Sequence, residues 1–458
     1  MNIHKLFKGI TLAMVACTAL VTTSCKDEPD AYETTSGKPT VYYIRPVSFD
    51  SRDSLLTQAS MGTTVCVVGS NLRSVTHLAF NDQEAVLNTS YMTDNTLIVT
   101  VPTGIPEVVT DQIYFVNSGK DTVSYDFHVI IPAPVVASMS NEWAAAGEEV
   151  TIVGDYFLDY ESYPLVVNFG KDYQLPRSAI QSIKKNYIVF TMPADAPSEK
   201  ISVTSIYGST EGAFMYKDTR GMLFDFDNPW KEGGAVLGNH GWHSRTITSD
   251  ATSLSGNYMV LGETAMGSDG GWNDGNFSFE YWPGDWGDPE NFATSPRMFD
   301  VADFSNADGL NLKFEMLIPE ENAWSAAPMQ IYFGSTAMVT NGAAGATDIY
   351  GNVLGGANNV FLHEQGKLSR ALYMPWKDDP DKVYHTGGKW TTVTLPISDF
   401  VYDFDGSKIG STYTSAADFA AFNIFIIKGT YNDKTALPDG VDCNPIIKID
   451  NIRVVPNK

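Results

Sequence analysis

The sequence is poor in the residues on which most catalytic and metal-binding motifs depend. It has 4 cysteines and 7 histidines among 458 residues, with no Cys-x-x-Cys motif and no histidine pair at metal-ligand spacing. The Gly-x-Ser-x-Gly turn, the His-Glu-x-x-His helix and the phosphate-binding glycine loop are also missing. These absences leave a disulfide framework and a zinc site without support. We therefore expect no metal and no cofactor.

Positive charge is scarce as well. Lysine and arginine number 30 against 54 acidic residues, which gives a formal net charge of −24. A polyanionic partner needs a basic face, so this balance argues against nucleic acid as a partner. The acidity suits a soluble surface protein or a neutral ligand, and solubility alone explains it equally well. Hydrophobic residues at 43% and aromatic residues at 12% exclude a disordered chain.

No apolar run is long enough to cross a bilayer as a helix. The run at residues 10–21 is short, follows Lys5 and Lys8, and ends at Thr22-Thr23-Ser24-Cys25. This order predicts a lipoprotein signal peptide over 1–24, with Cys25 carrying the lipid that anchors the chain to a membrane. An ordinary secretory signal with an incidental cysteine is the alternative. Lys26-Asp27-Glu28 resembles the export signal of surface lipoproteins in glycan-degrading Gram-negative bacteria, which implies display on the outer membrane, facing the exterior.

A weak internal repeat follows a small, polar tether at 25–37. Residues 62–72 and 147–157 share the pattern Gly-x-x-Val-x-hydrophobic-Val-Gly-x-x-hydrophobic. Residues 97–102 match 188–193, and 113–119 match 201–208. These short, branched runs between Gly and Pro predict two small β-sandwiches, at 38–132 and 133–217, joined by the stiff Pro-x-Pro of 132–134. Cys66 lies in one such apolar strand, so we expect a buried free thiol.

The composition changes after residue 217. Eight of the 9 tryptophans lie in 218–458, while strand patterns still dominate. Alternating apolar residues at 310–318 predict a half-buried strand, and 329–333, 390–395, 422–427 and 446–455 have similar patterns. Helical periodicity is scarce, apart from one short turn at 415–422. The fold class predicted is all-β, with two immunoglobulin-like sandwiches followed by a larger jelly-roll-like sandwich at 218–458.

Several aromatic residues of this last domain lie in loop-like sequence rich in Gly, Asp and Pro. Loops lie on the surface, and an exposed indole can stack on the apolar C–H face of a sugar ring. Neighbouring Asp, Asn, Gln and Lys side chains can pair with the sugar hydroxyls. Tryptophans that fold back over the sandwich edge are the competing explanation, and we prefer it for Trp230, Trp242 and Trp390. The candidate glycan-binding residues are Trp324, Trp282, Trp286, Trp376 and Tyr373.

These motifs together resemble a known class of surface protein. The repeat resembles IPT/TIG immunoglobulin-like domains, which mostly act as spacers or interaction modules. The segments 223–227 and 449–454 resemble the first and last strands of carbohydrate-binding β-sandwiches. The whole chain resembles the surface glycan-binding lipoproteins of bacterial polysaccharide-utilisation systems, nearest to those whose terminal domain binds xyloglucan. The resemblance implies noncatalytic capture of a polysaccharide or oligosaccharide, xyloglucan or a related β-glucan, beside an outer-membrane importer complex.

Two other functions stay open on the sequence alone. A glycoside hydrolase or lyase needs paired carboxylates in a sugar cleft, and Glu280, Asp285, Asp288 and Glu290 stand near tryptophans. In a chain with 54 acidic residues such neighbours arise by chance. A surface adhesin or structural protein fits the IPT/TIG-like repeats equally well, but fits the tryptophan-rich loops less well. We therefore predict a binding protein rather than an enzyme, with its site in 218–458.

Overall fold

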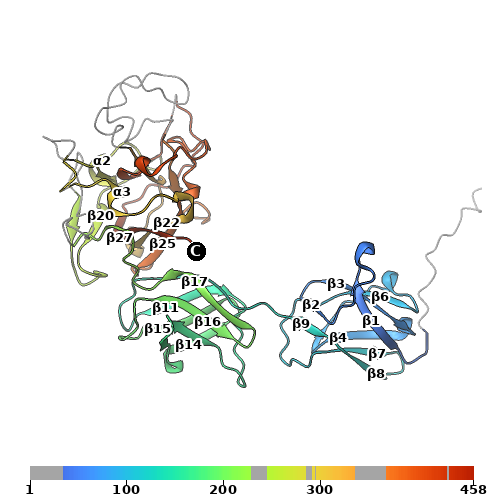
Figure 1. The fold of residues 1–458 in the computed structure, drawn as a ribbon. Coiled ribbons are helices and arrows are strands. Elements are labelled where there is room, and N and C mark those ends of the chain that lie inside the picture. The colour runs from blue at the N-terminus through green and yellow to red at the C-terminus, as the bar shows by residue number, and fades with distance from the viewer. Residues whose placement is uncertain (1–34, 228–244, 285–290, 294, 336–367, 431–432) are drawn as a thin grey trace, which may run out of the picture. The chain divides into compact units, whose positions relative to one another are not determined.

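A computed structural model describes residues 35–227, 245–284, 291–293, 295–335, 368–430 and 433–458 (Figure 1). The predicted signal peptide, Cys25, and the tryptophans at 230, 242 and 286 lie outside these ranges. The chain divides into two compact parts, residues 1–132 and 133–458, which are described separately. In the ranges described, no helix is both long and apolar enough for a membrane span.

The first part is an immunoglobulin-like sandwich. One sheet has the order β1 (Thr40–Pro46), β3 (Thr64–Ser70), β6 (Thr96–Thr100). The other has the order β5 (Gln83–Glu84), β4 (Val75–Phe80), β7 (Gln112–Asn117), β8 (Thr122–Asp126). A separate two-stranded parallel sheet is formed by β2 (Gln58–Ser60) and β9 (His128–Ile130). Cys66 is a buried free thiol in β3, as the sequence predicts.

The second part begins with another sandwich of the same kind. One sheet has the order β10 (Val135–Met139), β11 (Glu149–Asp155), β15 (Tyr187–Thr191), β14 (Ile180–Lys184). The other has the order β13 (Tyr173–Gln174), β12 (Val166–Phe169), β16 (Lys200–Ser205), β17 (Gly208–Met215). The repeated sequences therefore form equivalent strands, β3 with β11, β6 with β15, and β7 with β16. The repeated glycine has a steric reason. A Cβ on Gly69 would lie 2.0 Å from the carbonyl oxygen of Thr40, and one on Gly154 would lie 1.8 Å from that of Val135.

The larger terminal sandwich has two antiparallel sheets. The first has the order β19 (Thr246–Thr248), β20 (Tyr258–Gly262), β27 (Ile446–Pro456), β22 (Leu310–Leu317), β25 (Thr391–Pro396), and β18 (Met222–Phe224) also pairs with β27. The second has the order β21 (Ser278–Tyr281), β26 (Ala421–Ile426), β23 (Met329–Gly334), β24 (Ala371–Tyr373). The short helices α2 (Asp274–Phe277) and α3 (Met298–Val301) lie between strands in the sequence. The all-β prediction is confirmed.

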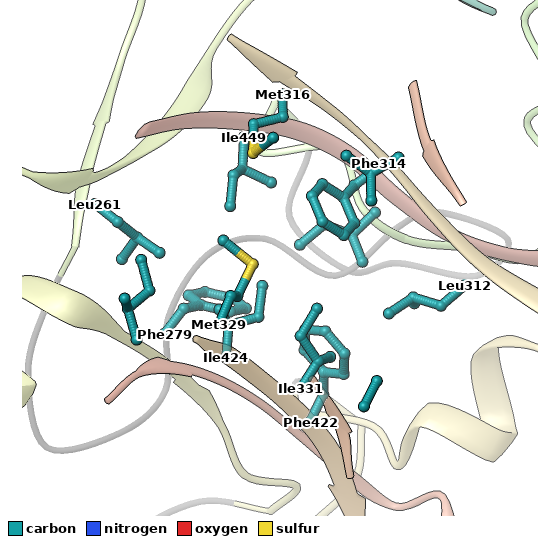
Figure 2. Close-up of a cluster of buried hydrophobic side chains, with 14 of the residues drawn as sticks. Leu261, Phe279, Leu312, Phe314, Met316, Met329, Ile331, Phe422, Ile424 and Ile449 are labelled. Carbon is teal, nitrogen blue, oxygen red and sulfur yellow. The ribbon is translucent and has the colours of Figure 1, made fainter. Parts of the chain in front are cut away.

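The main core lies between these two sheets. Figure 2 shows side chains of the first sheet, such as Leu312 and Phe314, meeting Ile331, Phe422 and Ile424 of the second. Strand β22 differs from the half-buried strand predicted for it, because both of its faces are buried. Its polar Lys313 and Glu315 point away from the core. Lys313 pairs with Glu142 of the preceding sandwich, and Glu315 accepts a hydrogen bond from the Thr392 hydroxyl of β25, which itself accepts one from the Glu142 amide.

Candidate functional site

A row of polar and aromatic side chains crosses the outer face of the second sheet. Strand alternation directs Phe279, Phe422 and Ile424 into the core and the residues between them outward. The strands are in register, so that Glu280 of β21 lies opposite Asn423 of β26, which lies opposite Tyr332 of β23. All three of these outward residues are buried. A sheet face turned away from a core is usually solvated, so this buried polar row needs an explanation.

Asn423 stands in the middle of this row without a hydrogen-bond partner. Its side chain has no exposed surface, and neither amide atom is hydrogen-bonded to any residue that the structure describes. A buried donor or acceptor left unpaired costs about 1–3 kcal/mol. Buried polar groups are nearly always paired, and the exceptions often mark functional positions. An amide with two free donors and an acceptor is suited to pair with the hydroxyls of a ligand.

The neighbouring amide side chain on the same sheet face, Gln330 of β23, is hydrogen-bonded through both its nitrogen and its oxygen. Gln330 donates from Nε2 to the carbonyl oxygens of Phe404 and Ile427, at 2.9 and 3.1 Å. Its Oε1 accepts a 2.8 Å hydrogen bond from Arg370. The Arg370 guanidinium lies 4.3 Å from the centroid of the Tyr332 ring. Gln330 and Arg370 therefore form a paired support that holds the Tyr332 ring in place.

Charge is also arranged around Glu280. The Ser278 hydroxyl donates to Glu280 Oε1 at 3.2 Å, which orients the carboxylate. Arg245 lies near Glu280 and Asp274, and burial lowers the pKa of its guanidinium while the two carboxylates oppose that shift. Burial has the opposite effect on the Tyr332 phenol and raises its pKa. The phenol therefore stays protonated and can donate a hydrogen bond. The row thus offers a carboxylate, an amide and a phenol side by side.

Two tryptophans flank the row, one on either side of it along β26. Trp272 is 50% exposed, and its ring meets that of Phe425 edge to face at 5.1 Å. Trp282 is half-buried and packs with Tyr332, Leu368 and Ala421. Ala421 and Phe425 share the outer face of β26 with Asn423 between them, four residues apart, so the two contacts are roughly 14 Å apart at ~3.4 Å per residue. That length suits a short oligosaccharide lying along the strand.

The structure corrects two of the candidate residues. Trp324 and Trp376 are completely buried, and their indole nitrogens donate to the carbonyl oxygens of Ala326 and Ala327 at 2.7 and 3.2 Å. Both belong to the main core, so they have no ring face on which a sugar could stack. Their segments have loop-like composition, but pairing of Trp324 with Tyr384 turns the first indole inward.

The other candidates have different outcomes. Tyr373 packs partly buried against the same core, with its ring 6.1 Å from that of Trp324, and burial raises the pKa of its phenol. Trp282 lies on the polar face, and Trp286 is outside the described residues. Trp390, expected in the core or at its rim, is 7% exposed and packs on Tyr258.

Sequence reasoning missed most of the polar row. Asn423 and Gln330 occupy alternate positions in the apolar runs 422–427 and 329–333, and that alternation was the available signal. Glu280 drew attention only as a possible catalytic acid beside Trp282. Trp272 lies in the loop sequence Gly-Gly-Trp-Asn-Asp-Gly, which indicated exposure but not which sheet face the ring would cover.

The fold and the face define a carbohydrate-binding type of β-sandwich that follows two immunoglobulin-like domains. Residues 216–456 match the model of the family described as the surface glycan-binding protein B xyloglucan binding domain. The match spans more than half of the chain, so this chain belongs to the surface glycan-binding protein B family. The family resemblance predicted from the sequence is thereby confirmed.

Two known proteins illustrate the relationship. The crystal structure of a surface glycan-binding protein B from Prevotella bryantii is 58% identical, covers 92% of this chain and 100% of its own, and superposes with a TM-score of 0.82. An IPT/TIG domain-containing protein of Bacteroides ovatus is 28% identical over 205 residues, which is 42% of this chain. The aligned part spans 40% of the length of that curated relative.

Proposed function

We propose that the terminal sandwich binds xyloglucan or a related β-glucan, without cleaving it, on the outer face of the second sheet. The observation that carries the proposal is the unpaired amide of Asn423, in register with Glu280 and Tyr332 and lying between Trp272 and Trp282. A pyranose ring can stack on the half-exposed indole of Trp272 through its C–H face. Its hydroxyls pair with the buried amide and carboxylate once the ligand displaces the groups that cover them. The description of the family, which names xyloglucan, supports the choice of glycan.

Calorimetric titration with purified xyloglucan tests the proposal. Trp272→Ala removes the most exposed ring at the face, and we expect a loss of roughly 1–3 kcal/mol, about 5- to 150-fold in affinity. Tyr163→Ala is the matched control, because that ring is also about half exposed, at 47%, but lies in the second immunoglobulin-like domain. Equal affinities for the Trp272 variant, the control and the unchanged chain would move the site elsewhere.

Catalysis is the rival to binding alone. The Prevotella bryantii relative is a glycan-binding protein by its description, which supports a noncatalytic role here. Prolonged incubation of the protein with xyloglucan, followed by measurement of reducing ends or unsaturated products, distinguishes the two functions. We expect retention of the polysaccharide and no products, whereas products that accumulate in proportion to protein would establish an enzyme.

We further propose that the chain is held at the cell surface by a lipid on Cys25 and delivers its glycan to an outer-membrane importer complex. The basic and apolar residues before Cys25 and the acidic residues after it support the anchor. Cys25→Ala should release the protein from outer-membrane fractions and reduce surface labelling of intact cells. Co-purification of the importer from gently solubilised membranes tests the second partner.

A further inference from the structure

A cleft lies between the second immunoglobulin-like domain and the terminal sandwich, on the opposite side of the sandwich from the polar row. Its volume is about 650 Å³, which falls within the usual size of small-ligand sites. One wall comes from residues 140–151 around β11, and the other comes from the outer face of the first sheet, where Trp390 and Leu317 pack together. The main core separates this face from the second sheet.

The two walls are held together by buried contacts. The carbonyl oxygen of Ser140 accepts hydrogen bonds from the Thr392 amide and the Thr391 hydroxyl, both at 2.9 Å. Two residues further on, Glu142 forms buried ion pairs with Lys313 and Arg453 of the terminal sandwich. These contacts fix the two walls beside each other, so a ligand would meet a preformed cleft.

The lining suits a neutral, hydroxyl-rich ligand. It offers hydroxyls, the Asn141 amide and the partly buried Tyr384, beside the buried Trp390. Glu148 accepts from Asn141 Nδ2 at 3.3 Å and so orients that amide. Exposed carboxylates at 148 and 149 disfavour an anion, and the exposed ammonium of Lys389 offsets part of their charge. A partly buried tyrosine among such polar groups matches an uncharged saccharide.

We infer that this cleft is a second saccharide site, which would let one protein hold two glycan segments on opposite faces of the sandwich. The inference rests on the proposed function, because it takes the same class of neutral glycan as the ligand. One short oligosaccharide cannot fill both sites, since the core separates them. A long polysaccharide would gain avidity from two contacts, either on one chain that wraps around the domain or on two chains.

Calorimetry with a short xyloglucan oligosaccharide, on the chain from residue 26 onward, tests this inference. We expect two equivalents bound per protein, falling to one in Thr151→Arg, whose larger side chain fills the cleft from the face of β11. Thr204→Arg is the matched control, because Thr204 occupies an equivalent outward position on β16 in the other sheet of the same domain and lies away from the cleft. If thermal melts show that the Thr151 variant is unstable, Glu149→Arg replaces it. Glu149 is exposed on the same wall, so its arginine side chain would also fill the cleft.

The outcomes separate the two proposals. One equivalent in the unchanged chain, unaffected by either cleft variant but lost with Trp272→Ala, would overturn the second site and leave the proposed function intact. Two equivalents that fall to one with the cleft variants and not with Thr204→Arg would support the second site, and two equivalents that neither cleft variant reduces would overturn it. No binding at all by the unchanged chain would overturn the proposed function, and the second site with it.

Discussion

At the scale of single residues, Asn423 gives the sharpest contrast between stability and function. Its buried amide is unpaired among the described residues, so Asn423→Leu removes polar groups that cost about 1–3 kcal/mol without breaking a bond. We expect a melting temperature equal to or above that of the unchanged chain, together with at least a tenfold loss of glycan affinity, about 1.4 kcal/mol. Paired thermal melts and calorimetric titrations measure both effects.

Gln330→Leu is the matched control for that prediction. Gln330 is equally buried on the same sheet face, but its amide makes three hydrogen bonds. Its removal takes away the acceptor of Arg370 Nη1 and the donor that serves two carbonyl oxygens, so this variant should melt at a lower temperature. If Asn423→Leu is destabilised as much as Gln330→Leu, the amide of Asn423 has a structural partner and its assigned role is wrong.

Asp450 sets a pH dependence of stability. Burial raises the pKa of its carboxyl to about 8, although Asn451 and Ser255 donate hydrogen bonds to it, and Glu315 and Asp227 add repulsion. The ordinary value is 3.8, so between about pH 4 and 8 the folded chain keeps a proton that the unfolded chain releases. The free energy of unfolding should therefore fall as pH rises through this range, by up to ~1.4 kcal/mol per pH unit from this group.

Urea unfolding at several pH values checks this dependence. Asp450→Asn carries no charge at any pH, so its unfolding free energy should fall less steeply between pH 5 and 8. Asp439→Asn is the control, because the Asp439 side chain is 71% exposed and pairs with Lys428. The same slope in Asp450→Asn as in the unchanged chain would show that other groups carry the dependence.

At the scale of elements, four buried charges join strands β22 and β27 to the preceding sandwich. Arg453 of β27 pairs with both carboxylate oxygens of Glu315 of β22, at 2.7 and 3.0 Å, and with Glu142 at 2.9 Å. Lys313 is the fourth buried charge and forms an ion pair with Glu142. The Trp143 ring lies 5.9 Å from the Arg453 guanidinium and shields it. The two carboxylates balance the two cations, which is the condition for burying such charges.

Removal of Glu142 should therefore destabilise the interface strongly. Glu142→Ala leaves Lys313 and Arg453 buried with one carboxylate between them, and we expect a loss of about 3–5 kcal/mol in unfolding free energy. The control is Glu211→Ala, since Glu211 forms an exposed 3.0 Å ion pair with Lys200 that contributes at most about 1 kcal/mol. Similar denaturation midpoints for the two variants would contradict the role of the buried group.

At the scale of the whole molecule, the second immunoglobulin-like domain belongs to the same compact part as the terminal sandwich. Residues 133–458 form one compact part, and residues 1–132 form another. We expect a fragment of 133–458 to fold cooperatively and to bind xyloglucan oligosaccharide with the affinity of the longer chain. A fragment of 218–458 should melt at a lower temperature, because it exposes Lys313, Glu315 and Arg453 without Glu142.

Thermal melts and calorimetry on the two fragments check this division. If 218–458 melts and binds as well as 133–458, the buried interface contributes nothing and the second domain is a simple spacer. Substantial binding by 26–132 alone would instead place a site in the first domain.

Much of the fold followed from local pattern. The repeated motif predicted two equivalent sandwiches. Its second glycine, Gly69 in one copy and Gly154 in the other, lies too close to a neighbouring carbonyl oxygen to carry a side chain. Alternation of apolar residues located β22, β23, β26 and β27 to within one or two residues. Such alternation depends only on which face of a strand meets the core. It can therefore be recognised from residues that are adjacent in the sequence.

The site depended on contacts that no local pattern contains. Loop-like sequence surrounds Trp272, Trp324 and Trp376 alike, yet the first is half exposed and the other two are completely buried. The difference arises because distant segments close over Trp324 and Trp376, while none covers Trp272 fully. The row of Glu280, Asn423 and Tyr332 exists only because three strands far apart in the sequence pair in one register. The sequence by itself therefore determined the strands and their class of fold, and tertiary pairing decided which polar and aromatic side chains meet, since burial and register depend on residues distant in the chain.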